Sequence, residues 1–439
     1  MTMTNFSLSR TLKLVLLFSV CSLFGSQLIG CEKETPSSLP ITQGTTQPDD
    51  TTWHPPILFE AYAASPASYP RHRPVIYGNH VVLFHSEEDN EEKWSGIVRY
   101  DITNGVRDTI LEDVYSVGLG SDVGPDGLIA YQSSIPNPKG LNVVNIPAGE
   151  LHSFVSTQGN GVSDASADGR FVLDLRENAD KSEVEIVRFY PSAGQMESLF
   201  RTPRAKPNNL NWSAGLWPLY WQVENADTLL FGVFSYHDDS SNNNKSHCFA
   251  YNLGEQKLMW VNEYPYESRA ASAQTIAVDD RHVYQKSPNR IVAFDRLTGE
   301  ERWRRDIDQA QINQSDIMIG DGYIYFLGDG AGGTMRLDAE TGTELTVVSP
   351  ITGTMTTARR IGNLYAFIST GNPGGHQIFL FDPFQGKYVA QWISPNCGPG
   401  RGANCGFFAD GINVDQERGY IVAHDWNWVY VFDVSDYLD

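Results

Sequence analysis

The stretch AVDDRHVYQKSPNRIVAFDRLTGEERWRRDI, residues 277–307, decides the fold class. Two runs of alternating apolar residues flank Asp279 and Asp280, a pair typical of a tight hairpin turn. A third apolar run ends at Asp295, Gly299 follows four residues later, and a last run carries Trp303. The stretch therefore predicts four short antiparallel strands in succession.

The same pattern of an apolar strand, an Asp or substitute, and a Gly four residues later recurs along the chain. The positions equivalent to Asp295 are Asp101, Asn145, Tyr190, Tyr251, Asp338, Asp382 and Asp433. The intervals between successive positions are 44, 45, 61, 44, 43, 44 and 51 residues. A period near 44 residues is typical of the four-stranded blades of a β-propeller. The longest interval contains HDDSSNNNKSH, residues 237–247, which we interpret as a lengthened hairpin loop.

These repeats predict an all-β domain over residues 57–439, an eight-bladed β-propeller of four-stranded blades, with seven blades as the alternative. The eighth unit stops at Asp439, just after its third strand. We expect ILFEAYA, residues 57–63, to supply the missing outer strand and so to close the ring without an exposed edge. No segment has the length and the 3.6-residue period of a substantial helix.

The recurring Asp and Gly are predicted to be structural. An Asp carboxylate accepts hydrogen bonds from nearby backbone N–H groups, and Gly adopts the positive φ that a tight turn requires.

The N-terminus has the features of an export signal. Arg10 and Lys13 precede an apolar run over residues 14–29, and no acid occurs there. The run ends in Leu-Ile-Gly-Cys, which resembles the lipobox of bacterial lipoproteins, where the cysteine is acylated. We therefore predict a signal peptide at 1–30, lipidation at Cys31, and a disordered tether over 31–56 that is rich in Pro, Ser and Thr. The alternative is an uncleaved membrane anchor with an incidental cysteine.

Charge and cysteine content narrow the class of partner and the compartment. The formal net charge is −21, and loss of residues 1–30 would leave −23, which argues against nucleic acid and against basic docking on anionic lipid. In an exported chain, Cys397 and Cys405 are expected to form a disulfide that closes CGPGRGANC. Cys248 is then left over, and we expect a buried free thiol.

Residues 277–307 resemble the PQQ-like propeller repeat, with its Asp-x-x-Thr-Gly turn and Trp-bearing strand. Asp338 to Gly342 repeats that turn, and Asp382 with Trp392 is a looser version. SDVGPDGLIAY and SDASADGRFVLDL, at 121–131 and 163–175, instead resemble the turns of TolB-type propellers. Lipidation together with PQQ-like repeats is similar to the BamB family of barrel-assembly lipoproteins, and this resemblance implies a scaffold that lacks catalysis.

No catalytic or cofactor-binding motif is readable. Quinoprotein dehydrogenases share the propeller but use an adjacent Cys-Cys pair and calcium ligands, and this sequence has no adjacent cysteines. The histidines show no His-x-His or His-Glu-x-x-His spacing of a zinc site. The run GDGAGG, residues 328–333, reads as a hairpin turn because no helix follows it. We therefore expect no enzyme, no cofactor and no metal site.

Two aromatic clusters are candidates for binding. His424, Asp425, Trp426 and Trp428 lie between two strands of the last unit and form a possible binding face, although tryptophans that pack blades together are the alternative. A second cluster, Trp212, Trp217 and Trp221, is expected to be buried.

The resulting hypothesis is a lipid-anchored propeller of the bacterial cell envelope that binds a protein partner, in a role such as outer-membrane protein assembly. Glu32 follows the lipidated cysteine in place of the Asp that signals inner-membrane retention, so we predict the outer membrane. The alternative is a carbohydrate- or small-molecule-binding propeller, or an envelope enzyme, with its site at the channel mouth.

Overall fold

A computed structural model describes residues 54–62, 74–89, 92–112, 117–119, 123, 127–133, 140–155, 172–177, 183–190, 195–203, 217–224, 229–238, 243–266, 275–287, 290–307, 316–327, 333–349, 357–369, 376–395, 406–425 and 427–438. They all belong to one compact unit, Thr52–Asp439.

The described strands form eight antiparallel sheets, numbered here in chain order. Sheet 1 contains β2 (Val75–Tyr77), β3 (His80–Asp89), β4 (Glu92–Asp101) and β5 (Arg107–Glu112). Sheet 2 contains β6 (Val117–Leu119), β7 (Leu128–Ser133), β8 (Gly140–Asn145) and β9 (Glu150–Val155). Sheet 3 contains β10 (Val172–Glu177), β11 (Glu183–Tyr190) and β12 (Gln195–Pro203), and sheet 4 contains β13 (Trp217–Glu224), β14 (Leu229–Asp238), β15 (Asn243–Asn252) and β16 (Lys257–Tyr266).

Sheets 5 to 8 repeat this arrangement. Sheet 5 contains β17 (Thr275–Val278), β18 (His282–Ser287), β19 (Arg290–Asp295) and β20 (Glu301–Asp306), and sheet 6 contains β21 (Met318–Gly320), β22 (Tyr323–Leu327), β23 (Thr334–Asp338) and β24 (Glu344–Ser349). Sheet 7 contains β25 (Ala358–Ile361), β26 (Leu364–Ser369), β27 (Gln377–Asp382) and β28 (Lys387–Trp392). Sheet 8 contains β29 (Phe407–Asp415), β30 (Tyr420–Asp425), β31 (Trp428–Asp433) and β1 (Ile57–Tyr62), and a short 3₁₀ helix, Ser435–Tyr437, follows it.

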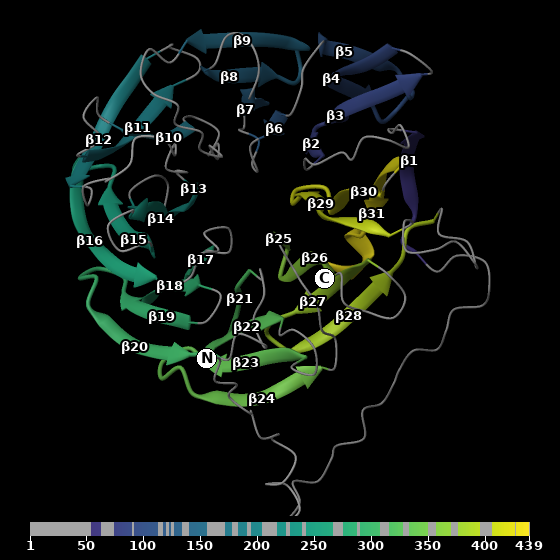
Figure 1. Cartoon of the computed structure of the whole chain (residues 1–439). Helices are drawn as coiled ribbons and strands as arrows, with labels where there is room; N and C mark the ends of the chain where they lie inside the picture. Colours follow the sequence, from purple (N-terminus) through teal and green to yellow (C-terminus); the bar gives the residue numbers. More distant parts are fainter. Residues whose placement is uncertain are drawn as a thin grey trace, which may run out of the picture. The chain divides into compact units, whose positions relative to one another are not determined.

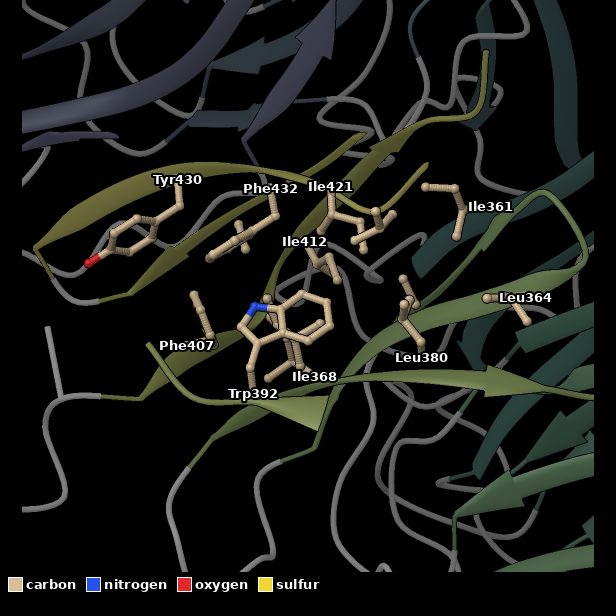
Figure 2. Packing of buried hydrophobic residues seen from close by; sticks show 14 residues of the cluster. Ile361, Leu364, Ile368, Leu380, Trp392, Phe407, Ile412, Ile421, Tyr430 and Phe432 are labelled. Carbon is tan, nitrogen blue, oxygen red and sulfur yellow. The ribbon is translucent and has the colours of Figure 1, made fainter. Parts of the chain in front are cut away.

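Within the unit 52–439 the sheets follow one another round a ring in chain order, which is the arrangement of a β-propeller (Figure 1). Apolar clusters fill the seams between neighbouring sheets. One of them packs Trp392 and Leu380 of sheet 7 against Phe407, Ile421 and Phe432 of sheet 8 (Figure 2). Burial of these side chains is the main force that holds the sheets together, at roughly 1.5–3 kcal/mol for each large residue.

The first strand closes the ring, as the sequence predicts. β1 pairs with β31 in antiparallel register, from Ile57 opposite Phe432 to Tyr62 opposite Trp428. Phe59 is the buried residue of β1, and its ring lies 5.7 Å from that of Tyr100 in sheet 1. The strand therefore completes sheet 8 and also packs against the first sheet.

The recurring Asp and Gly form the turns for which they were predicted. The Asp295 carboxylate accepts the N–H groups of Leu297 and Thr298, at 3.0 and 2.9 Å, and the Gly299 N–H donates to the Asp295 carbonyl oxygen. Gly299 has a φ of 72°. Asp338 repeats these contacts with Glu340 and Thr341, as the structural interpretation requires.

The fourth unit differs from its prediction by one residue. Asn252, and not Tyr251, takes the place of Asp295, because its side-chain oxygen accepts the Glu255 N–H at 2.9 Å. The residue four positions later is Gln256, which has a φ of 52° in the left-handed region that favours glycine. Because this turn has no glycine at the fourth position, sequence comparison alone misplaced its Asp equivalent.

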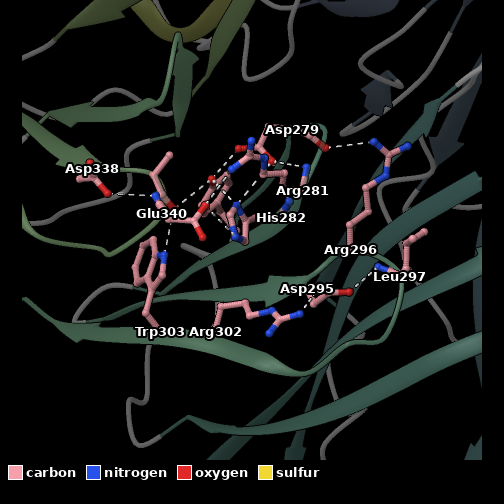
Figure 3. A network of polar contacts seen from close by, with 12 residues as sticks. Asp279, Arg281, His282, Asp295, Arg296, Leu297, Arg302, Trp303, Asp338 and Glu340 are labelled. Atoms are coloured by element: carbon pink, nitrogen blue, oxygen red, sulfur yellow. Dashed lines mark hydrogen bonds and ion pairs between the residues drawn. The ribbon is translucent and has the colours of Figure 1, made fainter.

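The same turns receive a side chain from the preceding sheet. The Trp260 indole N–H of sheet 4 donates to the Arg296 carbonyl oxygen at 3.1 Å. Trp303 of sheet 5 donates likewise to the Ala339 carbonyl oxygen, at 2.9 Å (Figure 3). A Cβ on Gly299 would lie only 2.6 Å from Trp260 Cδ2, so glycine also makes room for the ring. The Trp of the repeat therefore joins its own sheet to the turn of the next sheet, and we call such a side chain a staple.

Trp392 does not occupy this stapling position, contrary to its interpretation as a looser copy of the repeat. It lies opposite Ile378, whereas Ala390 takes the place that corresponds to Trp303. Its ring instead meets Phe432 edge to face at 5.5 Å within the apolar cluster between sheets 7 and 8 (Figure 2).

Candidate functional site

The two ends of the sheets differ in construction. At one end, here called the turn face, lie the connections between the first and second and between the third and fourth strands of sheets 1, 2 and 4 to 7, together with the β11–β12 and β29–β30 connections. The main chain ties two turns together there in sheets 1, 2, 5 and 6; in sheet 5 the Arg296 N–H donates to the Arg281 carbonyl oxygen. In sheet 8 the Val434 N–H, just after β31, donates to the Gly419 carbonyl oxygen in the same way. The turn face is thus built of short turns joined to one another.

The opposite end, here called the loop face, carries the β3–β4, β14–β15 and β30–β31 connections and those that lead from one sheet to the next. Two hairpins extend further there than their neighbours. β3 pairs with β4 as far as Asp89 and Glu92, and β14 with β15 as far as Asp238 and Asn243, so each of these strands is ten residues long. The β18, β19, β26 and β27 strands have six. Four extra residues add roughly 13 Å to a strand.

The polar insertion at residues 237–247 therefore has a different structure from the one predicted. We expected a longer loop, but the inserted residues lengthen the strands, since His237 pairs with Asn244 and Asp238 with Asn243. The result is a projection of sheet 4 at the loop face, in which β16 also takes part because Tyr266 pairs with Asn244.

Buried polar side chains gather at the loop ends of the middle strands. In globular proteins such side chains are rarely buried unless they are paired, because desolvation is costly. The buried polar residues at or near these ends are Gln285, Lys286, Thr334, Ser369, His424 and Asp425. We call this set the polar belt.

The best-defined part of the polar belt is the β30–β31 connection. One carboxylate oxygen of Asp425 accepts the N–H groups of Asn427 and Trp428, at 2.7 and 2.6 Å. The other accepts the hydroxyls of Ser394 and Tyr430, at 2.5 and 3.1 Å. Asp425 thus fixes the turn and joins it to the segment that follows sheet 7.

The predicted binding face at this connection is only partly accessible. His424 and Asp425 are buried, Trp428 is half-buried, and Trp426 lies outside the described residues. Trp428 meets Tyr62 of β1 edge to face at 5.5 Å, and Tyr62 is 54 % exposed. The accessible surface here is therefore the aromatic pair Tyr62–Trp428, while a role of all four residues in binding stays a prediction.

Sequence reasoning missed Ser394 and Tyr430, which complete the hydrogen-bond network around Asp425. It also missed Arg99, whose guanidinium donates to the carbonyl oxygens of Ile146 and Pro147, at 2.7 and 2.6 Å. Arg99 thereby staples sheet 1 to the turn of sheet 2, as Trp303 does between sheets 5 and 6. No local signal marks Ser394 or Arg99, because their partners lie 31 to 48 positions away in the chain, whereas Tyr430 lies only five positions from Asp425 and could have been suspected.

A polar network on the turn face joins sheets 5 and 6 (Figure 3). The Tyr284 hydroxyl donates to Asp279 at 2.5 Å, and burial is the main cause that raises the pKa of Tyr284. Arg281 pairs with Glu340 at 3.3 Å. The Asp295 carboxylate is held by Arg302 at 2.6 Å, and this hydrogen bond is the largest of the causes that lower the pKa of Asp295. Of these contacts, only the Arg281–Glu340 pair crosses between the two sheets, since the other two lie within sheet 5, and the network has no evident catalytic arrangement.

The cysteine predictions lie mostly outside the described residues. Cys31, Cys397 and Cys405 are among the residues that the structure does not describe, so the lipidation and the disulfide stay predictions. Cys248 is a free, buried thiol as expected, and burial raises its pKa.

Within the described ranges no cluster of three or more His, Cys, Asp or Glu side chains has the arrangement of a metal site. Over the same part of the chain, no helix is both long and apolar enough to cross a membrane.

No family model matches the chain, and no curated protein matches it. Among solved structures it is similar to BamB from Moraxella catarrhalis, with 11 % identity and a TM-score of 0.48 over 86 % of this chain and 98 % of that one. It is also similar to the β-propeller domain of the Trilobed protease from Pyrococcus furiosus (11 %, 0.41, 85 % and 96 %) and to Porphyromonas gingivalis dipeptidyl peptidase 4 (12 %, 0.44, 88 % and 59 %). The ring of eight antiparallel sheets identifies the chain as a β-propeller.

Proposed function

We propose that this chain is a lipid-anchored, eight-bladed propeller of the bacterial cell envelope, which binds a protein partner through its loop face without catalysis. In this proposal each of the eight sheets is one blade, residues 1–30 are the signal peptide, and residues 31–56 tether the propeller to the outer membrane. A role in outer-membrane protein assembly is the specific form that the PQQ-like repeats and the lipobox suggest.

The observation that carries the proposal is the difference between the two faces. The turn face consists of short turns that bond to one another, whereas the loop face carries two ten-residue hairpin arms and the Tyr62–Trp428 pair. Projecting strands offer main-chain groups for β-strand addition, and exposed aromatic side chains contribute strongly to protein interfaces. The formal charge of −21 favours a partner with a basic surface.

The experiment is a crosslinking pull-down of the tagged lipoprotein from native membranes, with mass spectrometry of the captured proteins. A matched variant replaces residues 236–245 by Asn-Gly, which joins the paired Ser235 and Ser246 by a two-residue turn. We expect this variant to lose the partner, while a Leu297→Ser, Phe384→Ser variant of the turn face keeps it. Capture of no specific protein by the intact chain, or equal capture by both variants, would contradict the proposal.

A second candidate, a small polar ligand at the loop face, is favoured by Gln285. This side chain is buried, and neither its amide oxygen nor its amide nitrogen has a hydrogen-bond partner in the described part of the chain. An unsatisfied buried amide costs roughly 1–3 kcal/mol for each group. Binding of a glycan or small amide by the intact chain, abolished in Gln285→Leu, would support this candidate.

A further inference from the structure

The chain enters the propeller at the turn face. The Asp433 N–H at the end of β31 donates to the Pro56 carbonyl oxygen at 2.9 Å, and the His54 ring lies 6.2 Å from that of Phe432. β1 then runs away from the turn face and reaches Tyr62 at the loop face. Any tether that precedes His54 therefore leaves from the same end as the short turns.

Exposed apolar side chains concentrate at this end too. In the described part of the chain, nine large hydrophobic side chains are exposed, and only Tyr62 lies at the loop end of its strand. Leu297 and Phe384 lie on turn tips and Val106 lies at the base of the β4–β5 turn, and they are 62 %, 52 % and 53 % exposed. Leu58, Met196 and Leu345 are each the second residue of a strand that begins at the turn face, and Tyr437 follows β31 there.

We propose that the turn face lies against the bilayer that holds the lipidated Cys31, with Leu297 and Phe384 in contact with its surface, so that the loop face points away from the membrane. This inference rests on the proposed lipid anchor. It assigns the bilayer as the partner of the turn face and leaves the loop face for the protein partner.

The reach of the tether favours this orientation. Twenty-two residues separate Cys31 from His54, and a flexible chain of that length spans about 25 Å on average. A six-residue strand is about 20 Å long, so the loop face is roughly one tether length further from the anchor than the turn face. The tether alone permits both orientations, and the apolar turn tips then favour contact through the turn face.

The contact is expected to be apolar in nature. Near Leu297 two acidic groups are paired with arginines: Asp295 with Arg302 and Glu340 with Arg281 (Figure 3). These two ion pairs reduce the negative charge beside the turn tip. Because the chain as a whole is acidic, anionic lipid would repel it, and we expect contact with zwitterionic lipid.

The test is site-specific photo-crosslinking of the full-length lipoprotein in native membranes. A photo-reactive amino acid replaces Leu297 or Phe384 on the turn face, and Asp306 or Glu112 at the loop ends of β20 and β5 as matched exposed controls. Lipid adducts, detected by mass spectrometry, are expected at Leu297 and Phe384 at several times the yield at the two control positions.

The failure of this inference is distinguishable from that of the anchor. Cys31→Ser tests the anchor: if the wild-type chain carries no acyl group, the anchor and this orientation are both overturned. If the wild-type chain is acylated but the adduct yields are equal at the two faces or higher at Asp306, the orientation alone is overturned. Turn-tip crosslinks to a protein instead of lipid would overturn it as well.

Discussion

At the residue scale, some turn glycines of this propeller meet two requirements, a positive φ and space for a ring from another sheet. The sequence indicates only the first of them. Gly342 needs a positive φ and also leaves space for the Trp303 ring, whereas Gly322 needs only the positive φ, since a Cβ added there would meet nothing within 4 Å. The Asp-x-x-Thr-Gly pattern predicts the turn. It does not predict the ring that packs on it, because that ring comes from another sheet.

Gly342→Ala is expected to lower the free energy of unfolding by about 1–2 kcal/mol for the backbone conformation and by roughly 1–3 kcal/mol more for the displaced indole. Gly322→Ala, in the same sheet and with a similar φ, is the matched control and should lose only the first part. Thermal or denaturant unfolding measures both. Equal losses would show that the close approach of Trp303 contributes nothing.

Gln256→Gly is expected to stabilise the protein by about 1 kcal/mol, because it relieves a left-handed backbone that a side chain disfavours. The comparison is Gln385→Gly in the corresponding turn of sheet 7, where Gly386 already takes the left-handed position. That change should destabilise, since it only adds freedom to the unfolded chain. A fall in the unfolding midpoint of Gln256→Gly would contradict the expectation.

Asp425→Asn tests whether Asp425 holds the β30–β31 connection in place or contacts the protein partner. An amide nitrogen cannot accept the hydroxyl hydrogens of Ser394 and Tyr430, so we expect a loss of about 2–3 kcal/mol in the free energy of unfolding. Ser394→Ala, which removes one donor, should lose about 1 kcal/mol. Loss of partner capture with unchanged stability would instead place Asp425 in the binding face.

At the scale of the element, strands and turns could be predicted far better than the contacts between sheets. Alternating apolar residues and Asp-Gly turns predict the strands of sheets 5 to 7, because strands and turns depend on neighbours in the sequence. The role of β1 could be predicted because the last unit would otherwise have an unpaired edge. The role of Trp392 was predicted wrongly, because this ring lies two positions after the one that corresponds to Trp303. The repeats alone do not show such a shift along the strand. The arms of sheets 1 and 4 were also missed, since polar residues in a long hairpin resemble a loop.

Phe59→Ala is expected to weaken ring closure, because the side chain is buried between sheets 8 and 1. The expected loss is about 3–5 kcal/mol in the free energy of unfolding. Leu58→Ala, the exposed neighbour on the other side of the same strand, should change stability by less than about 0.5 kcal/mol. Comparable losses from the two variants would mean that β1 does not pack as described.

At the scale of the whole molecule, the two ends of the propeller expose different kinds of surface. Short bonded turns and exposed apolar tips lie at the end where the chain enters, and hairpin arms and the polar belt lie at the other end. The polar belt could not be predicted from the sequence, because its members lie in different sheets and each looks like an ordinary polar residue beside a loop.

Cys31→Ser is expected to release the protein from the membrane fraction, since no basic surface would hold an acidic chain on lipid. Fractionation of cell envelopes and metabolic labelling with a fatty acid measure the change. The propeller itself should keep its unfolding midpoint, because Cys31 lies outside the compact unit Thr52–Asp439. Continued sedimentation of the variant with membranes would contradict lipidation as the anchor.

The pairing of β1 with β31 also has a consequence for folding. β1 is the first described strand, and its partner, Trp428–Asp433, is the last one. Sheet 8 therefore joins segments that are more than 360 positions apart in the chain, and closing so long a loop slows folding. Until the two strands pair, the edge of β1 is open to pairing with other chains, which favours aggregation.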